Sequence, residues 1–115
     1  MTTGVFICHA SEDAATARQI VDILEAAGTP CWIAPRNIPP GAEFTTAILD
    51  ALAAAPAVVL VFSGAANGSP HVRRELETVV GQDTPLLPVR ADDVDPSPSL
   101  RYFIGTSQWL DTDGV

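Results

Sequence analysis

Two glutamates stand close together in a segment whose pattern predicts the start of a helix. The segment reads SPHVRRELETVV, from Ser69 to Val80, and it carries Glu75 and Glu77. Apolar residues at helical spacing define its buried stripe, namely Val72, Leu76, Val79 and Val80. At about 100° per residue, Glu75 borders one flank of this stripe, while Glu77 lies further round the other. The pattern therefore modestly favours Glu75 for chemistry and places Glu77 on the wet side of the helix.

The other nucleophilic and metal-binding residue types form no recognisable site. Cys8 and His9 are neighbours in a strand-like run, and adjacent side chains of a strand point to opposite faces. His71 is distant in the chain, and the two histidines have no metal-ligand spacing. The acidic residues show no spacing typical of the carboxylate pair of an ordinary glycosidase. Taken by themselves, the cysteine and the histidines are expected in core and loop roles, and no metal site is expected.

The elements that must position these groups alternate between strand and helix. Strands are predicted at residues 4–9, 30–33, 57–63, 85–89 and 107–110. Helices are predicted at 12–27, 44–55 and 70–81, and residues 64–68 are predicted to form a loop. Ser11 and Gly28 are the expected cap and stop of the first helix, and Ser69 with Pro70 is the expected start of the third. Such alternation calls for parallel strands with helices on both faces.

In sheets of this kind, ligands bind beyond the carboxyl ends of the strands. The loops at 9–13, 34–43 and 63–71 are therefore the expected surroundings of the site.

Composition narrows the classes of function. The chain has 115 residues, enough for one domain, and its 14 acidic and 6 basic residues give a net charge of −8. A field of that sign repels polyanions, so nucleic acid is not an expected partner. The longest apolar run, AVVLVF, is too short for a membrane helix, and the start MTTGVF does not resemble a secretory leader. We expect a cytoplasmic domain with no membrane segment and with reduced thiols at Cys8 and Cys31.

Missing residues exclude three folds that also alternate strands and helices. The turn after the first strand, CHASEDAA, contains no glycine, so it does not fit a Rossmann dinucleotide site. All basic residues are arginines, and the absence of lysine excludes a GxxxxGK phosphate loop. A response-regulator receiver also needs a lysine, as well as an Asp at the end of the third strand, where this chain has Phe62 and Ser63.

Four segments occur in an order that is typical of one family: VFICHASED, CWIAPRNIPPG, AVVLVFSGAANGSPHVRREL and QWLD. Together they resemble a Toll/interleukin-receptor (TIR) domain of the bacterial type over roughly Gly4 to Asp111, within a single domain at 1–115. The resemblance implies a flavodoxin-like α/β fold with five parallel strands in the order 2-1-3-4-5. It also implies that Ala34 to Glu43 is the BB loop, through which TIR domains assemble with one another. Because the polar end DTDGV follows closely on the last predicted strand, we expect the chain to be a domain of a longer protein whose fused or partner domain senses the trigger.

The resemblance further implies one of two activities. Some TIR domains are non-catalytic adaptors, whereas others cleave NAD⁺, as substrate and not as cofactor, at the nicotinamide–ribose bond. In the enzymes, one essential glutamate lies near the start of the third helix, four residues after a position that is often tryptophan. These positions correspond here to Glu75 and His71. The family's usual ISYS is ICHAS in this chain, and Asn37 stands where related loops often have Asp.

One carboxylate is sufficient for this reaction. Ordinary glycosides need an acid to protonate a poor leaving group, whereas the nicotinamide of NAD⁺ is already cationic and departs neutral. A carboxylate can hold the ribose hydroxyls and stabilise the positive charge that develops on the sugar. Attack by water then gives ADP-ribose, and attack by adenine gives a cyclised ADP-ribose.

Candidate substrate-binding residues follow from the same resemblance. The pyrophosphate is expected at the amino end of the first helix, around His9, Ala10 and Ser11, with help from Arg36 and from Arg73 or Arg74. The arginines can equally be surface residues paired with acids. Rings and pocket walls are assigned to Trp32, Ser69 and His71. Core packing is equally plausible for Trp32 and is favoured for Phe44, and N-capping alone would explain Ser69.

The sequence thus predicts a TIR-domain NAD⁺ glycohydrolase with Glu75 as its catalytic residue, activated by self-assembly in bacterial immune or antiphage signalling. The alternative is a non-catalytic interaction module that acts through Ala34 to Glu43.

Overall fold

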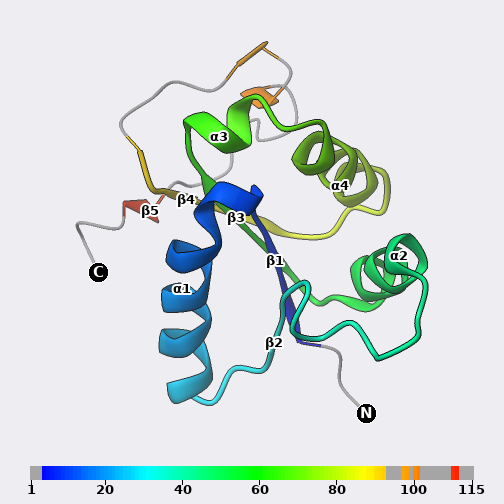
Figure 1. Cartoon of the computed structure of the whole chain (residues 1–115). Helices are drawn as coiled ribbons and strands as arrows, with labels where there is room; N and C mark the ends of the chain where they lie inside the picture. Colours follow the sequence, from blue (N-terminus) through cyan, green and yellow to red (C-terminus); the bar gives the residue numbers. More distant parts are fainter. Residues whose placement is uncertain (1–3, 93–96, 99, 102–109, 112–115) are drawn as a thin grey trace.

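The computed structural model describes residues 4–92, 97–98, 100–101 and 110–111 of the chain. Its core is a parallel five-stranded sheet with the strand order β2-β1-β3-β4-β5 (Figure 1). The strands are β1 (Val5–Cys8), β2 (Cys31–Trp32), β3 (Val58–Phe62), β4 (Leu86–Arg90) and β5 (Leu110–Asp111). The fold class and strand order predicted from the sequence are confirmed.

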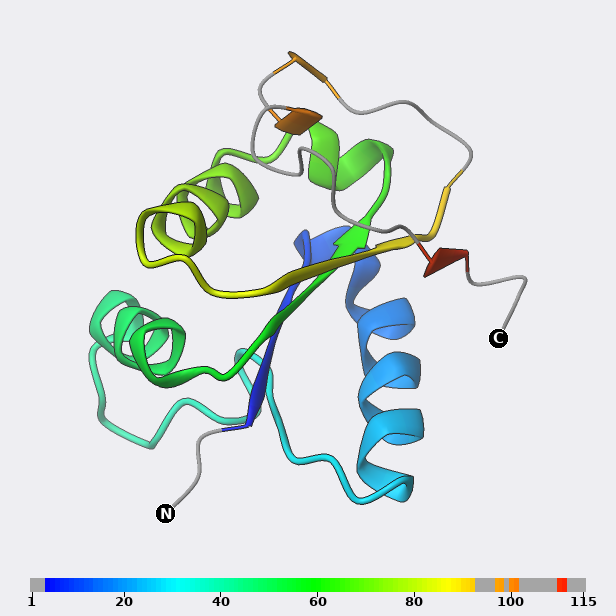
Figure 2. The same cartoon turned by 180° about the vertical axis from the view of Figure 1, so that it is seen from behind.

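Helices cover both faces of the sheet, as Figures 1 and 2 show. The helical elements are η1 (Ser11–Asp13), α1 (Ala14–Ala26), α2 (Phe44–Ala54), α3 (Gly64–Asn67) and α4 (Pro70–Gly81). On one face, α1 packs Ala17 and Val21 against the sheet. On the other, α2 and α4 pack side chains such as Leu52 and Leu76 against it.

Strand β3 lies in the middle of the sheet and is buried throughout. Its Leu60 and Phe62 belong to the core beneath α2 and α4, whereas Val59 and Val61 belong to the core beneath α1. Because successive side chains of a strand point to opposite faces, a strand covered on both sides must be apolar at every position. The continuous apolar run in the sequence therefore identified this strand.

Glycine is required where β1 begins. A Cβ atom at Gly4 would lie 2.5 Å from the backbone carbonyl carbon and oxygen of Pro30. The next residue, Val5, donates its amide to that same carbonyl oxygen at 2.9 Å. Only a residue without a side chain lets β1 and β2 start this close together.

Several sequence-based boundaries were wrong. Ser11 does not cap α1, because a turn of 3-10 helix intervenes and Asp13 is the N-cap residue. Residues 64–68 were expected to form a loop, but α3 occupies most of them and is capped by the Ser63 side chain, which accepts from the Ala66 amide at 3.0 Å. Val80 was assigned to the buried stripe of α4 and is exposed.

The last described strand is β5 at Leu110–Asp111, which agrees with the prediction at 107–110 for Leu110 and extends it to Asp111, whereas residues 107–109 lie outside the described part of the chain. Both cysteines are buried free thiols. Among the described residues, no helix has the length and apolar character needed to cross a bilayer.

Candidate active site

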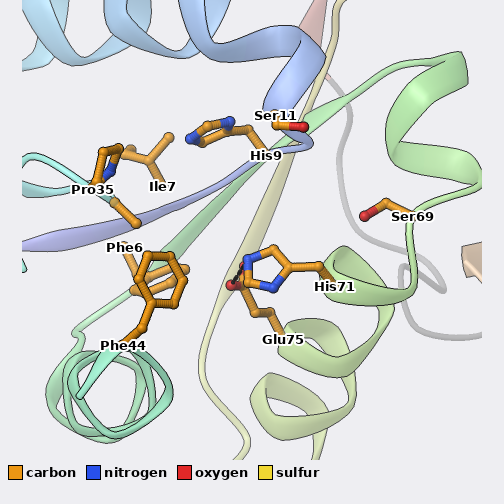
Figure 3. A pocket seen from close by; sticks show the side chains of 10 residues that line it. Phe6, Ile7, His9, Ser11, Pro35, Phe44, Ser69, His71 and Glu75 are labelled. Carbon is orange, nitrogen blue, oxygen red and sulfur yellow. Dashed lines mark ion pairs between the residues drawn. The ribbon is translucent and has the colours of Figure 1, made fainter.

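A cavity of about 350 Å³, here called the α4 cavity, lies at the carboxyl end of the sheet (Figure 3). Its lining comes from β1, the loops after β1 and β2, and the starts of α2 and α4: Phe6, Ile7, His9, Ser11, Ala34, Pro35, Phe44, Ser69, His71 and Glu75. This is the end of a parallel sheet at which ligands bind, and all three loops expected to surround the site contribute to it.

Glu75 is the acidic residue of this cavity. It is only 5% exposed and is the one buried Asp, Glu, His or Arg side chain among the described residues, whereas Glu77, two positions later on α4, is exposed. A buried carboxylate is costly unless a partner or a function compensates for its desolvation. The structure therefore separates the two acids as the helical pattern indicated.

The start of α4 is firmly anchored, and this fixes the direction of Glu75. Ser69 is the N-cap residue, and its hydroxyl accepts a hydrogen bond from the amide of Val72 at 3.2 Å. Pro70 occupies the first helical turn, where a missing amide proton costs nothing. The predicted cap is confirmed, and the Ser69 side chain also lines the cavity.

Glu75 pairs with His71 one helical turn before it. Nε2 of His71 lies 2.7 Å from Oε2 of Glu75, and the two side chains meet at the cavity wall (Figure 3). The hydrogen bond with Glu75 raises the pKa of His71 above its ordinary value, although partial burial and Arg74 oppose the shift. The imidazole therefore keeps its proton to higher pH than a free histidine would.

Cys8 lies behind the carboxylate, in the core beneath α4. Burial raises the pKa of its thiol well above the ordinary value, and the charge of Glu75 and a hydrogen bond with that carboxylate raise it further. Sequence reasoning assigned Cys8 a plain core role and did not foresee its proximity to Glu75, because the pairing joins a strand to a helix distant in the chain.

Most of the predicted site residues come together. His9, Ser11, Ser69, His71 and Glu75 all line the α4 cavity. Ala10 is buried beside them, and its carbonyl oxygen accepts hydrogen bonds from Nδ1 of His9 at 2.7 Å and from the amide of Asp13 at 2.9 Å.

Trp32 and Arg36 are not part of this cavity. The Trp32 ring stacks on Phe6, with ring centroids 5.3 Å apart and planes inclined by 11°. Arg36 forms two hydrogen bonds to Glu25 of α1, at 3.1 and 2.8 Å, and a third to the carbonyl oxygen of Cys31 at 3.1 Å. In this structure Trp32 therefore serves in packing, and Arg36 serves in a salt bridge with Glu25.

The amino end of the first helix is also less suited to an anion than expected. Two acids, Glu12 and Asp13, stand in its first turn. The hydroxyl of Ser11 donates to Glu12 at 3.1 Å, and the hydroxyl of Ser63 donates to Asp13. Carboxylates at this position already use the positive end of the helix dipole, so they weaken its attraction for a pyrophosphate.

Phe44 is the cavity residue that sequence reasoning placed elsewhere. Core packing was favoured because Phe44 falls on the apolar pattern of its helix, but the residue is 52% exposed and its ring borders the α4 cavity. It is the first residue of α2, so no preceding helical turn covers it. Its position at the start of the helix was the feature of the sequence that could have indicated this exposure. Ala34 and Pro35 were not singled out individually, although their loop was.

Two further hollows lie beside α2. A side cavity of about 260 Å³ between α2 and α4 shares Phe44, His71 and Glu75 with the α4 cavity and adds Arg74. A loop hollow of about 540 Å³ is lined by Trp32, Asn37 and residues of α2 and its preceding loop, including Glu43 and Asp50. Within the described residues, no cluster of His, Cys, Asp or Glu is suited to a metal ion.

Known structures are similar to this chain over most of its length. The TIR domain of the Toll-related receptor TRR-2 from Hydra magnipapillata is 25% identical with a TM-score of 0.81, over 97% of this chain and 86% of that one. A metazoan TIR-STING receptor from C. gigas is 27% identical with a TM-score of 0.73, and the match covers 95% of this chain but 37% of that one.

The TIR domains of the Roq1 resistosome, which directly recognises the pathogen effector XopQ, are 22% identical with a TM-score of 0.69. That match covers 79% of this chain and 58% of the other, and at this identity it shows the fold alone. No curated protein matches the chain. The family model for the TIR domain, however, matches residues 5–114, and the chain therefore belongs to the TIR-domain family.

Proposed function

We propose that this TIR domain is an NAD⁺ glycohydrolase with Glu75 as its catalytic residue. The observation that carries the proposal is the burial of this single carboxylate in the wall of a cavity at the carboxyl end of the sheet. A charge kept at such a place, with perturbed titratable groups around it, is a recognised mark of an active site. The position is also the one at which the sequence resemblance to catalytic TIR domains puts the essential glutamate.

The reaction needs no general acid. The bond between ribose C1′ and the nicotinamide nitrogen breaks, its electron pair goes to the ring nitrogen, and the cationic ring leaves as neutral nicotinamide. The positive charge passes to the sugar, where the Glu75 carboxylate stabilises it. Water then attacks C1′ and releases a proton to give ADP-ribose, or an adenine nitrogen attacks to give a cyclised product.

The rest of the lining suits the two parts of the substrate that meet at this bond. Ile7, Pro35 and Phe44 offer an apolar and aromatic surface for the nicotinamide ring. His9 and Ser69 supply polar groups within reach of a ribose. A mainly apolar cavity with a few polar groups is typical of small-molecule sites.

For the phosphates, we assign Arg74 in preference to Arg36. Arg74 borders the side cavity that shares His71 and Glu75 with the α4 cavity, whereas Arg36 is engaged by Glu25. A local cation is needed because the net charge of −8 disfavours a substrate that carries a pyrophosphate.

The second candidate function is a non-catalytic interaction module. It is favoured by the exposure of residues 39–43 in the Ala34 to Glu43 loop, which leaves that loop open to a partner. We propose that the same loop mediates the homotypic assembly that activates cleavage, in an immune or antiphage signalling pathway with a fused or partner sensor domain.

The test is NAD⁺ consumption by the purified chain at high concentration or with a crowding agent, followed by chromatography of the products. Wild type and Glu77→Gln are expected to cleave NAD⁺ at similar rates, and Glu75→Gln about 100-fold or more slowly, because a carboxamide cannot neutralise the developing charge. Equal rates for Glu75→Gln and Glu77→Gln would show that Glu75 has no catalytic role. Assembly of wild type without any cleavage of NAD⁺ would favour the interaction module.

A further inference from the structure

We propose that His71 is a positioning residue for Glu75 whose charge state gates the reaction: the neutral imidazole orients the carboxylate, and the imidazolium blocks it. This inference rests on the proposed function and assigns a specific role to the residue that this chain has in place of the family's common tryptophan.

The geometry places His71 between the carboxylate and the solvent. The side chain of His71 is 50% exposed, whereas that of Glu75 is 6% exposed, and their polar atoms are 2.7 Å apart. Both residues line the α4 cavity and the side cavity, so the imidazole flanks the carboxylate in either approach (Figure 3). The spacing of four residues on α4 keeps the two side chains on one face of the helix.

The two protonation states of His71 have opposite consequences for cleavage. A neutral imidazole that donates through Nε2 fixes the direction of the carboxylate and leaves its negative charge available to the sugar. An imidazolium compensates that charge, and it also repels both the cationic nicotinamide ring and the positive charge that develops at C1′. A tryptophan at this position would hold a ring but could not respond to pH.

The groups around His71 determine the pH at which its imidazole becomes neutral and cleavage can proceed. On α4, Glu75 raises the pKa of His71, and Arg74 lowers it. Across the α4 cavity, the loop after β1 contributes His9, while α2 and the loop after β2 contribute the uncharged Phe44 and Pro35. The net effect is a pKa above the ordinary value, so the imidazolium persists to higher pH than that of a free histidine, and cleavage rises as pH increases through that raised pKa.

The first experiment compares pH profiles of kcat for wild type, His71→Gln and Glu77→Gln. Glutamine keeps an N–H donor but cannot be protonated, and Glu77 is exposed and lines neither cavity. Wild type and Glu77→Gln are expected to lose about tenfold in kcat per pH unit on the acid side, and His71→Gln to lose this limb. An unchanged acid limb in His71→Gln overturns the proposal.

His71→Leu separates positioning from gating. It removes the donor as well as the charge, so we expect a kcat without the acid limb that stays about tenfold below the high-pH value of wild type, while KM stays within about twofold. Full activity in His71→Leu at high pH would contradict the positioning role.

The second experiment titrates the His71 ring by nuclear magnetic resonance and does not depend on the reaction. The midpoint of the His71 titration is expected to fall in Glu75→Gln and to stay unchanged in Glu77→Gln. If wild type cleaves no NAD⁺, the proposed function fails, and this titration alone then decides the link between the two side chains. An unchanged midpoint in Glu75→Gln overturns that link.

Discussion

The α4 cavity and the loop hollow differ in a way that size does not reveal. The loop hollow is the larger of the two, at about 540 Å³ against 350 Å³, and it contains two acids, Glu43 and Asp50. Both of these acids are exposed, and Glu43 accepts a hydrogen bond from the hydroxyl of Thr46 at 2.5 Å, as acids at helix starts commonly do. The α4 cavity is smaller, but its one carboxylate is buried. Burial of a charge, more than volume, distinguishes a site that can do chemistry.

The same contrast applies to a pair of acid–base contacts among the described residues. Arg36 and Glu25 are both partly exposed, and their hydrogen bonds lower the pKa of Glu25, so the pair behaves as a surface salt bridge. His71 and Glu75 combine an exposed base with a buried acid. A fold gains little stability from such a buried carboxylate, which argues that the pair is retained for its function.

The largest expected effect comes from replacing the carboxylate of the α4 cavity by an amide, in comparison with the same replacement in the loop hollow. Glu75→Gln is expected to reduce the rate of NAD⁺ cleavage about 100-fold or more. The double variant Glu43→Gln/Asp50→Asn is expected to stay within about twofold of wild type, because neither side chain borders the α4 cavity. Rates should be measured at matched protein concentration. A loss of similar size in the double variant would make the loop hollow the better site.

The aromatic residues of the two hollows should separate stability from binding. Trp32→Leu removes the stack on Phe6 and is expected to lower the free energy of unfolding by about 1–3 kcal/mol. Phe44→Leu changes an exposed ring and is expected to leave stability within about 0.5 kcal/mol while raising KM about three- to tenfold. Urea unfolding measures the stability, and initial-rate kinetics measure KM. A rise in KM for Trp32→Leu without one for Phe44→Leu would indicate that Trp32, and not Phe44, contacts the substrate ring.

The smallest effect is expected at the surface pair. Arg36→Gln is expected to shift Tm by no more than about 4 °C, since exposed ion pairs contribute little and are screened by salt. The shift should shrink further in high salt. Thermal unfolding at low and high ionic strength measures it, and NAD⁺ cleavage at saturating substrate should not change. A large rise in KM would instead assign Arg36 to the phosphates.

The parts of the fold that local patterns determine were predictable. A strand covered on both faces must be apolar throughout, which identified β3, and a Ser-Pro pair before an apolar helical pattern identified the start of α4. The flank position of Glu75 on that helix followed from periodicity, and its burial in the structure agrees with it.

The parts that depend on distant partners were not predictable. The sequence offered no reason for Arg36 to turn toward Glu25 of α1, or for the Trp32 ring to lie on Phe6, because these contacts depend on how a loop and two strands meet in space. Phe44 matched the apolar pattern of α2, but its place at the exposed end of the helix put it at the cavity. Periodicity predicts which face a residue belongs to and not whether another element covers it.

The close start of β1 and β2 has a consequence for how the sequence can vary over evolution. Since any Cβ at position 4 would collide with the backbone of Pro30, no change of side chain in a neighbour can make room for one. The strand that begins at this point also carries Phe6 and Ile7 into the cavity wall. Related chains that keep the pocket should therefore keep a glycine here even where the surface around it diverges, which makes position 4 a distant signature of the site.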